Sequence, residues 1–329
     1  MNRREFIASV VTAAVFPVAA HAQQSERPRR VDVLIAELTE DDPYYEGRLT
    51  ALTQGMRGLG WIDGQNLKLV IHRVSTKPAE LRKHITELLA QQPDLVVSGG
   101  STTTAPLLQM TTSVPIVFTS AVDPVGAGFV ESLAHPGGNV TGFMQFDYSL
   151  SGKWLELLKQ LVPPIVRAGV IRDASTPSGI AQFAVIQSVA GSLGVDIVPI
   201  GARDGGEIER GMAKLARYPN AGLITSTGAS VIGHRDLILK LAAQYKLPAV
   251  YANKSYVDHG GLVSYGADQL VSARLAADYV DRILKGTKPD DLPVQVPTKY
   301  ELVINLKTAK ALGLDLPAAV VARADQVIE

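Results

Sequence analysis

The sequence predicts an α/β fold with two lobes, each built on a parallel sheet, and a hinge of several crossing strands between them. Three observations support this prediction. Short runs rich in valine, isoleucine and leucine alternate with segments of helical spacing. The alternation occurs in two series that divide near residue 150. Stretches rich in glycine and proline, with short strand signals, follow each series.

The first series follows a polar linker, expected at residues 23–30. Strands that alternate with helices of about 10–15 residues form βαβ units, and their continuous apolar runs fit a sheet covered on both faces. The predicted strands are 31–37, 66–72, 95–97 and 114–119, and the predicted helices are 45–59 and 78–91.

The second series has the same form, although the two halves show no close sequence repeat. The predicted strands are 168–171, 196–200, 221–225 and 249–251, and the predicted helices are 154–161, 180–193, 208–218 and 235–245.

Three stretches are expected to cross between the lobes: 136–142, 260–266 and 293–306. They assign 31–141 plus 266–297 to lobe I, and 142–265 plus 298–329 to lobe II. Two lobes joined in this way form a cleft that can close around a ligand.

The first 22 residues predict export from the cytoplasm. Arg3 and Arg4 precede an apolar run, which ends in the small-x-small site Ala20-His21-Ala22. This pattern is typical of a cleaved secretory signal, and the arginine pair favours the twin-arginine route over an ordinary Sec signal. The expected product is a soluble periplasmic protein.

Composition narrows the possible partners. The chain has 32 basic and 32 acidic residues, which argues against a nucleic-acid-binding surface. It has no cysteine, so a thiol nucleophile and a lipid anchor on an N-terminal cysteine are excluded. We expect a monomer that uses no cofactor.

Candidate ligand contacts in lobe I follow the third and fourth strands, because ligands of open α/β sheets lie beyond the carboxyl ends of the strands. Four consecutive hydroxyl residues begin at Ser101, more than one helix cap needs. Asp123 either contacts a ligand or initiates an Asp-Pro turn. The candidates are Ser98, Gly100, Ser101, Thr102, Ser120 and Asp123.

Candidate contacts in lobe II follow its strands in the same way. Arg172 either grips a carboxylate or lies on the solvated surface. Aromatic residues near strand ends and crossings either stack on a planar ligand or fill the core. The candidates are Arg172, Thr225, Ser226, Thr227, Tyr251 and Tyr265, and the further aromatic residues are Tyr44, Tyr45, Phe143 and Phe146.

Catalytic motifs are absent from the sequence. It contains no G-x-S-x-G, H-E-x-x-H, complete Walker A or G-x-G-x-x-G pattern, and its histidines show no metal-ligand spacing. The chain is therefore not expected to be an enzyme, although a triad of distant residues needs no local motif.

Several segments resemble the ABC transporter substrate-binding family typified by tryptophan- and tyrosine-type uptake proteins. The most specific are VDPVGAGFVESLAHPGGNVTG and PTKYELVINLKTAKALGLDLP, and the likeness spans nearly all of residues 31–329. The resemblance implies a type I periplasmic binding fold with two Rossmann-like lobes. It also implies ligand contacts in the turns 98–102, 120–123 and 225–227. Many relatives have Asn-Pro where this chain has Arg172-Asp173, a turn that faces the cleft in such proteins.

The resulting hypothesis is a periplasmic solute receptor that binds an amino acid or an aromatic or branched carboxylate and delivers it to an ABC permease in the inner membrane. One alternative is a sensor partner that docks on a membrane receptor. A second is an exported hydrolase, which would need a Ser–His pair in the pocket. The effector domain of a cytoplasmic repressor shares the fold, but the export signal opposes that role.

Overall fold

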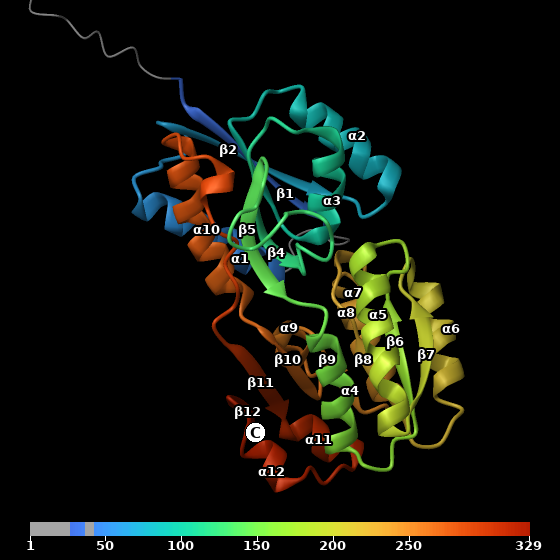
Figure 1. Ribbon diagram of the computed structural model, residues 1–329. Coiled ribbons are helices and arrows are strands. Elements are labelled where there is room, and N and C mark those ends of the chain that lie inside the picture. Colours follow the sequence, from blue (N-terminus) through green and yellow to red (C-terminus); the bar gives the residue numbers. More distant parts are fainter. Residues whose placement is uncertain (1–26, 37–42) are drawn as a thin grey trace, which may run out of the picture.

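The computed structural model describes residues 27–36 and 43–329, and of Pro43 and Tyr44 only the backbone. The predicted export signal and the side chain of Tyr44 therefore lie outside the described part. The chain forms two lobes, each around its own sheet (Figure 1). The predicted α/β architecture with parallel sheets is confirmed.

Lobe I contains a five-stranded sheet in the order β2-β1-β3-β4-β5, and all neighbouring strands are parallel. Helices α1 and α10 pack together over one face, and α2 and α3 cover the other (Figure 1). The strands are β1 (Arg29–Ala36), β2 (Leu67–Val74), β3 (Leu95–Ser98), β4 (Ile116–Val122) and β5 (Val140–Phe146). The helices are α1 (Pro43–Gly58), α2 (Pro78–Leu89), α3 (Ser101–Met110) and α10 (Gln269–Leu284).

Lobe II contains a seven-stranded sheet in the order β12-β11-β10-β9-β8-β6-β7, in which only the pair β10 and β11 is antiparallel. Helices α4 and α5 lie on one face, and α6 and α8 on the other. The strands are β6 (Arg167–Arg172), β7 (Asp196–Gly201), β8 (Ala221–Thr225), β9 (Ala249–Tyr251), β10 (Val263–Ala267), β11 (Tyr300–Asn305) and β12 (Gln326–Ile328). The helices are α4 (Leu150–Leu161), α5 (Pro177–Ala190), α6 (Gly205–Leu215), α7 (Ala229–Ile232), α8 (Arg235–Gln244), α9 (Lys254–Asp258), α11 (Leu306–Leu312) and α12 (Ala318–Val321), with short 3-10 turns at Gly191–Leu193 and Pro289–Asp291.

The chain passes between the lobes three times within the described residues. It leaves lobe I after β5, returns between β10 and α10, and enters lobe II again before β11 (Figure 1). The first passage lies after Phe146, later than the expected boundary at 141/142, because β5 as a whole pairs with β4.

The pairing of β5 with β4 requires glycine at position 142. Gly142 has φ +148°, and a Cβ there would lie 2.0 Å from the carbonyl oxygen of Phe118. The segment before the third passage also stays with lobe I, since the backbone N–H of Met144 donates to the carbonyl of Gln295 at 2.8 Å. These contacts tie two of the three connections to the edge of the first sheet.

No helix among the described residues combines the length and the apolar character needed to cross a bilayer.

Candidate ligand-binding site

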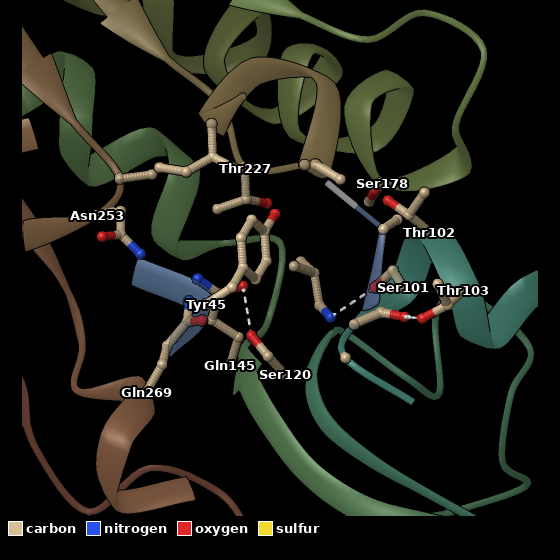
Figure 2. A pocket seen from close by; sticks show the side chains of 18 of the residues that line it. Tyr45, Ser101, Thr102, Thr103, Ser120, Gln145, Ser178, Thr227, Asn253 and Gln269 are labelled. Carbon is tan, nitrogen blue, oxygen red and sulfur yellow. Dashed lines mark hydrogen bonds between the residues drawn. The ribbon is translucent and has the colours of Figure 1, made fainter. Parts of the chain in front are cut away.

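A cavity of about 70 Å³ lies between the lobes, at the carboxyl ends of β1, β3 and β4 on one side and of β8 and β9 on the other (Figure 2). This is the position expected for the site of an open α/β sheet. The volume holds a solute of several non-hydrogen atoms. A second cavity of about 270 Å³ adjoins it and shares Arg48, Asn253 and Gln269 as lining residues, so a longer solute can extend into it.

The turn between β3 and α3 forms the first wall. Gly100, Ser101, Thr102 and Thr103 line the cavity. Ser101 begins α3, and its hydroxyl oxygen accepts a hydrogen bond from the backbone N–H of Val122 at 2.9 Å. The N-terminus of α3, with its unpaired N–H groups and partial positive charge, therefore faces the cavity and favours an anionic group.

Strands β4 and β5 contribute an adjacent polar pair to this wall. Ser120 donates a hydrogen bond to the amide oxygen of Gln145 at 3.2 Å, and both residues line the cavity (Figure 2). Both side chains are buried, so this hydrogen bond holds them at fixed positions beside the turn at Ser101.

Helix α1 places an aromatic ring and a cation at the cavity. Tyr45 and Arg48 are both buried, at 5% and 7% exposure. Arg48 donates through Nη2 to the carbonyl oxygen of Gly99 at 2.5 Å and to Oγ1 of Thr119 at 2.7 Å. In Figure 2 the ring of Tyr45 stands between Gln145 and Thr227.

Lobe II forms the opposite wall with Ser178, Ser226, Thr227 and Asn253 (Figure 2). Ser178 lies in the first turn of α5, and Ser226 and Thr227 follow β8. Asn253 caps α9, since its amide oxygen accepts from the backbone N–H of Ser255 at 2.8 Å. The side chain of Thr227 is held from behind by Gln182, which is fully buried in α5.

Arg48 is the one charged side chain among the described residues that line this cavity, and none of these residues is an aspartate, glutamate or histidine. Arg48 and the N-terminus of α3 both place positive charge at this wall of the cavity. A site of this kind favours a carboxylate or another anionic oxygen group.

Six of the residues predicted from the sequence line the cavity, and the structure brings them together from both lobes. They are Gly100, Ser101, Thr102, Ser120, Ser226 and Thr227.

Three other predicted residues support the turns instead. Ser98 is fully buried, with its hydroxyl 2.6 Å from that of Thr103. Asp123 has φ +39° and accepts from the backbone N–H of Gly126 at 2.8 Å, so its carboxylate stabilises the Asp-Pro turn. Thr225 is fully buried, and its hydroxyl oxygen accepts from the backbone N–H of Ala252 at 3.4 Å.

Arg172, Tyr251 and Tyr265 also lie away from this cavity. The Arg172 guanidinium stacks over the ring of Phe183 at 4.3 Å. Tyr251 is buried against Tyr256 with ring centroids 4.6 Å apart, and burial raises the pKa of its hydroxyl. Tyr265 packs at the edge of the second core.

Of the other aromatic candidates with described side chains, one lines the cavity and two lie in the cores. Tyr45 lines the cavity, whereas Phe143 packs on Tyr279 and Phe146 on Trp154 in the cores. Tyr45 is thus the aromatic residue of this set that is placed to contact a solute.

Sequence reasoning missed several polar residues of the cavity: Arg48, Gln145, Ser178, Asn253 and Gln269. Asn253 could have been found, because it lies two residues after the end of the predicted strand 249–251, as the chosen residues lie after theirs. Ser178 lies further from a strand end, in the first turn of α5. Arg48 and Gln269 belong to helices of lobe I, and no local pattern marks them.

No group of three or more acidic or histidine side chains in the described part is arranged to hold a metal ion. The residues of the cavity offer hydroxyl, amide and guanidinium groups, which recognise an organic solute through hydrogen bonds.

The fold and the site together define a two-lobed binding protein whose ligand is enclosed between the lobes. The chain belongs to the ABC transporter substrate binding protein family, whose model matches residues 32–328. Its role as the solute-binding component of an ABC uptake system, predicted from the sequence, is confirmed.

Three relatives illustrate the likeness. A tyrosine-binding protein from Clostridioides difficile (strain R20291) is 25% identical over 292 residues, which cover 89% of this chain and 84% of that protein. The crystal structure of a conserved domain protein from Vibrio cholerae has a TM-score of 0.84 at 28% identity, covering 92% of this chain and 100% of that one. An ABC domain from Streptococcus pneumoniae in complex with L-Trp has a TM-score of 0.81 at 24% identity, covering 91% of this chain and 100% of that one. These neighbours confirm the predicted type I periplasmic binding fold.

Proposed function

We propose that this protein binds an amino acid with an aromatic or branched side chain, and that the solute carboxylate lies near Arg48 and the N-terminus of α3. The observation that supports this most directly is the charge of the cavity. Arg48 is the charged group among its described lining residues, and hydroxyl groups surround it from both lobes. Two relatives, one a tyrosine-binding protein and one in complex with L-Trp, favour the same class of solute.

The apolar part of the solute is proposed to lie against Tyr45. The far end of a longer solute would reach the adjoining cavity of about 270 Å³, which polar and charged side chains mainly line. The first cavity alone is small for an aromatic amino acid, whereas the two together extend along the hinge. Ring-on-ring contact with Tyr45 stabilises an aromatic side chain beyond the area that it buries.

Binding is proposed to act by closure of the lobes. Ser101 and Ser120 come from lobe I and Thr227 from lobe II, so a solute that contacts all three favours the closed state. The closed form is then recognised by an ABC permease. A sensor that docks on a membrane receptor would need the same closed form. This alternative would be favoured if the closed form failed to bind the permease in a binding assay.

The location and the remaining properties rest on the sequence. The arginine pair, the apolar run and the Ala20-His21-Ala22 site support export to the periplasm and cleavage after Ala22. The balanced charge supports a protein without nucleic-acid partners. A hydrolase is not favoured, since no histidine is among the described residues of the first cavity, and His259 of the adjoining cavity is bonded through Nδ1 to the backbone carbonyl of Ser255 at 2.7 Å. We propose a monomeric, non-enzymatic receptor that needs no cofactor.

The test is isothermal titration calorimetry of the purified protein with L-tyrosine, L-tryptophan, L-phenylalanine and L-leucine. Tyramine and tryptamine, which lack the carboxylate, serve as matched controls. We expect micromolar or tighter binding of at least one amino acid and a loss of at least about 100-fold for its amine, since a charge-assisted hydrogen bond contributes about 1.5–3 kcal/mol and the carboxylate makes several. Equal binding of acid and amine would refute the proposed orientation, and no binding of any amino acid would refute the solute class.

A further inference from the structure

Gln182 is a fully buried amide directly behind the lobe II wall of the cavity. It lies in α5, it does not line the cavity, and among the described residues its side chain forms its hydrogen bonds with Thr227. Thr227 is partly exposed and lines the cavity. We propose that Gln182 is a positioning residue that fixes the Thr227 hydroxyl on the lobe II wall, so that a solute meets this hydroxyl in one defined geometry. This rests on the proposed function of the cavity.

The orientation of the Gln182 amide follows from the backbone of Thr227. A backbone N–H can only donate, and that of Thr227 lies 3.0 Å from Oε1 of Gln182. The amide oxygen must therefore face the N–H. A flipped amide would place its own NH₂ group against this donor and leave both unsatisfied. The contact thus fixes which end of the amide is nitrogen.

The fixed amide also holds the Thr227 hydroxyl. With the oxygen facing the N–H, Nε2 of Gln182 donates to Oγ1 of Thr227 at 2.9 Å. Oε1 has two lone pairs, so besides the backbone N–H it accepts the Thr227 hydroxyl at 3.1 Å. Both ends of the buried amide therefore hold the Thr227 hydroxyl at one position on the wall of the cavity.

The opposite wall also holds a hydroxyl group in a fixed position. Ser101 accepts the backbone N–H of Val122 at 2.9 Å, and it lines the cavity. Hydroxyl groups in fixed positions on both lobes favour a solute whose polar atoms reach both walls. Such a solute contacts Thr227 and Ser101 together only when the lobes are closed, which couples recognition to closure.

The test compares Gln182→Met and Thr227→Val, singly and combined, with Gln187→Met as the control on the exposed side of the same helix. Titrations use L-tyrosine and L-tryptophan. We expect each single variant to raise Kd about tenfold, and the double variant to bind no more weakly than Thr227→Val, because Gln182 acts through Thr227. Thr227→Ser should keep the affinity of the unmodified protein within about threefold. Additive losses in the double variant would overturn the proposal.

A second measurement does not depend on the solute. Amide hydrogen exchange at Thr227, followed by NMR in the unliganded protein, should be at least tenfold faster in Gln182→Met and unchanged in Gln187→Met. Equal exchange in both variants would overturn the role of Gln182. If the unmodified protein binds neither amino acid, the proposed solute class is wrong, while the exchange rates still decide whether Gln182 holds Thr227.

Discussion

At the scale of single residues, one short turn of the candidate site contains both hydroxyl groups that are bonded within the lobe and hydroxyl groups that line the cavity. Ser98 and Ser101 lie three positions apart, yet Ser98 is bonded within the lobe and Ser101 lines the cavity. The sequence predicted that this turn contributes to the site. It did not separate the two serines, because the direction of a loop side chain depends on backbone angles and distant partners such as Val122.

Among the side chains of the site, Arg48 should affect the affinity for the solute most when it is replaced. Arg48→Lys retains a charge but loses the planar donor set that reaches Gly99 and Thr119. We expect Kd for a confirmed amino-acid solute to rise about tenfold or more, as measured by calorimetry. The control is Arg57→Lys, at the exposed end of the same helix, which should not change Kd. Unchanged affinity in Arg48→Lys would place the solute carboxylate elsewhere.

Acid should destabilise lobe I through a buried cluster on β1, β2 and α2. Asp32 is fully buried, and although burial acts to raise its pKa, hydrogen bonds from Arg30 and His72 hold that pKa below its usual value. Burial and the neighbouring His72 lower the pKa of His84, partly offset by Glu87. Both groups have depressed folded pKa values, so their contribution is present above their unfolded pKa values and lost as the pH falls through the folded ones.

The melting temperature is therefore expected to fall in two stages, first below about pH 6.5 for His84 and then below about pH 4 for Asp32. Thermal unfolding from pH 8 to pH 3 measures this. His84→Gln should remove most of the fall in melting temperature that begins below about pH 6.5. A profile of this variant identical to that of the unmodified protein would show that His84 does not titrate as inferred.

At the scale of elements, the periodicity of the sequence was sufficient for most helices and strands of the two series. The predicted strand 221–225 coincides with β8, and the predicted helix 78–91 overlaps α2. The short helices α7, α9, α11 and α12 were not predicted, because four to seven residues give too little periodicity to recognise.

Gly142→Ala tests the element that closes the first sheet. The added Cβ would meet the Phe118 carbonyl oxygen at 2.0 Å, and the φ of +148° is unfavourable for any side chain. We expect the free energy of unfolding to fall by at least about 3 kcal/mol in urea titrations. Gly194→Ala is the matched control, since it has φ +62° but open space around it, and it should cost only about 1–2 kcal/mol. Similar losses in both variants would show that the contact with Phe118 relaxes freely.

At the scale of the whole molecule, three passages of the chain join the two lobes that carry the walls of the cavity. The walls of the cavity come from residues more than 100 positions apart, such as Ser120 and Thr227. Only the closing of both lobes on one solute brings these groups into contact with it, which is the physical basis of the proposed receptor function.

Export is the other property of the whole chain that can be tested. Replacing Arg3 and Arg4 by lysine should stop twin-arginine export, so that the precursor accumulates in the cytoplasm of a bacterial host. Immunoblots of periplasmic and cytoplasmic fractions measure this, with the unmodified protein as the control. Normal periplasmic levels of the variant would instead identify an ordinary Sec signal.

The sequence by itself determined the two-lobed α/β class, the family and several of the turns that line the cavity. These depend on local periodicity and on motifs of neighbouring residues. The tertiary structure decided which hydroxyl groups face the cavity and brought Arg48 from α1, and Gln269 from a helix more than 200 residues later, to the same cavity. The reason is physical: a strand end fixes where a turn lies, but the packing of distant elements fixes which of its side chains are covered and which remain open to a ligand.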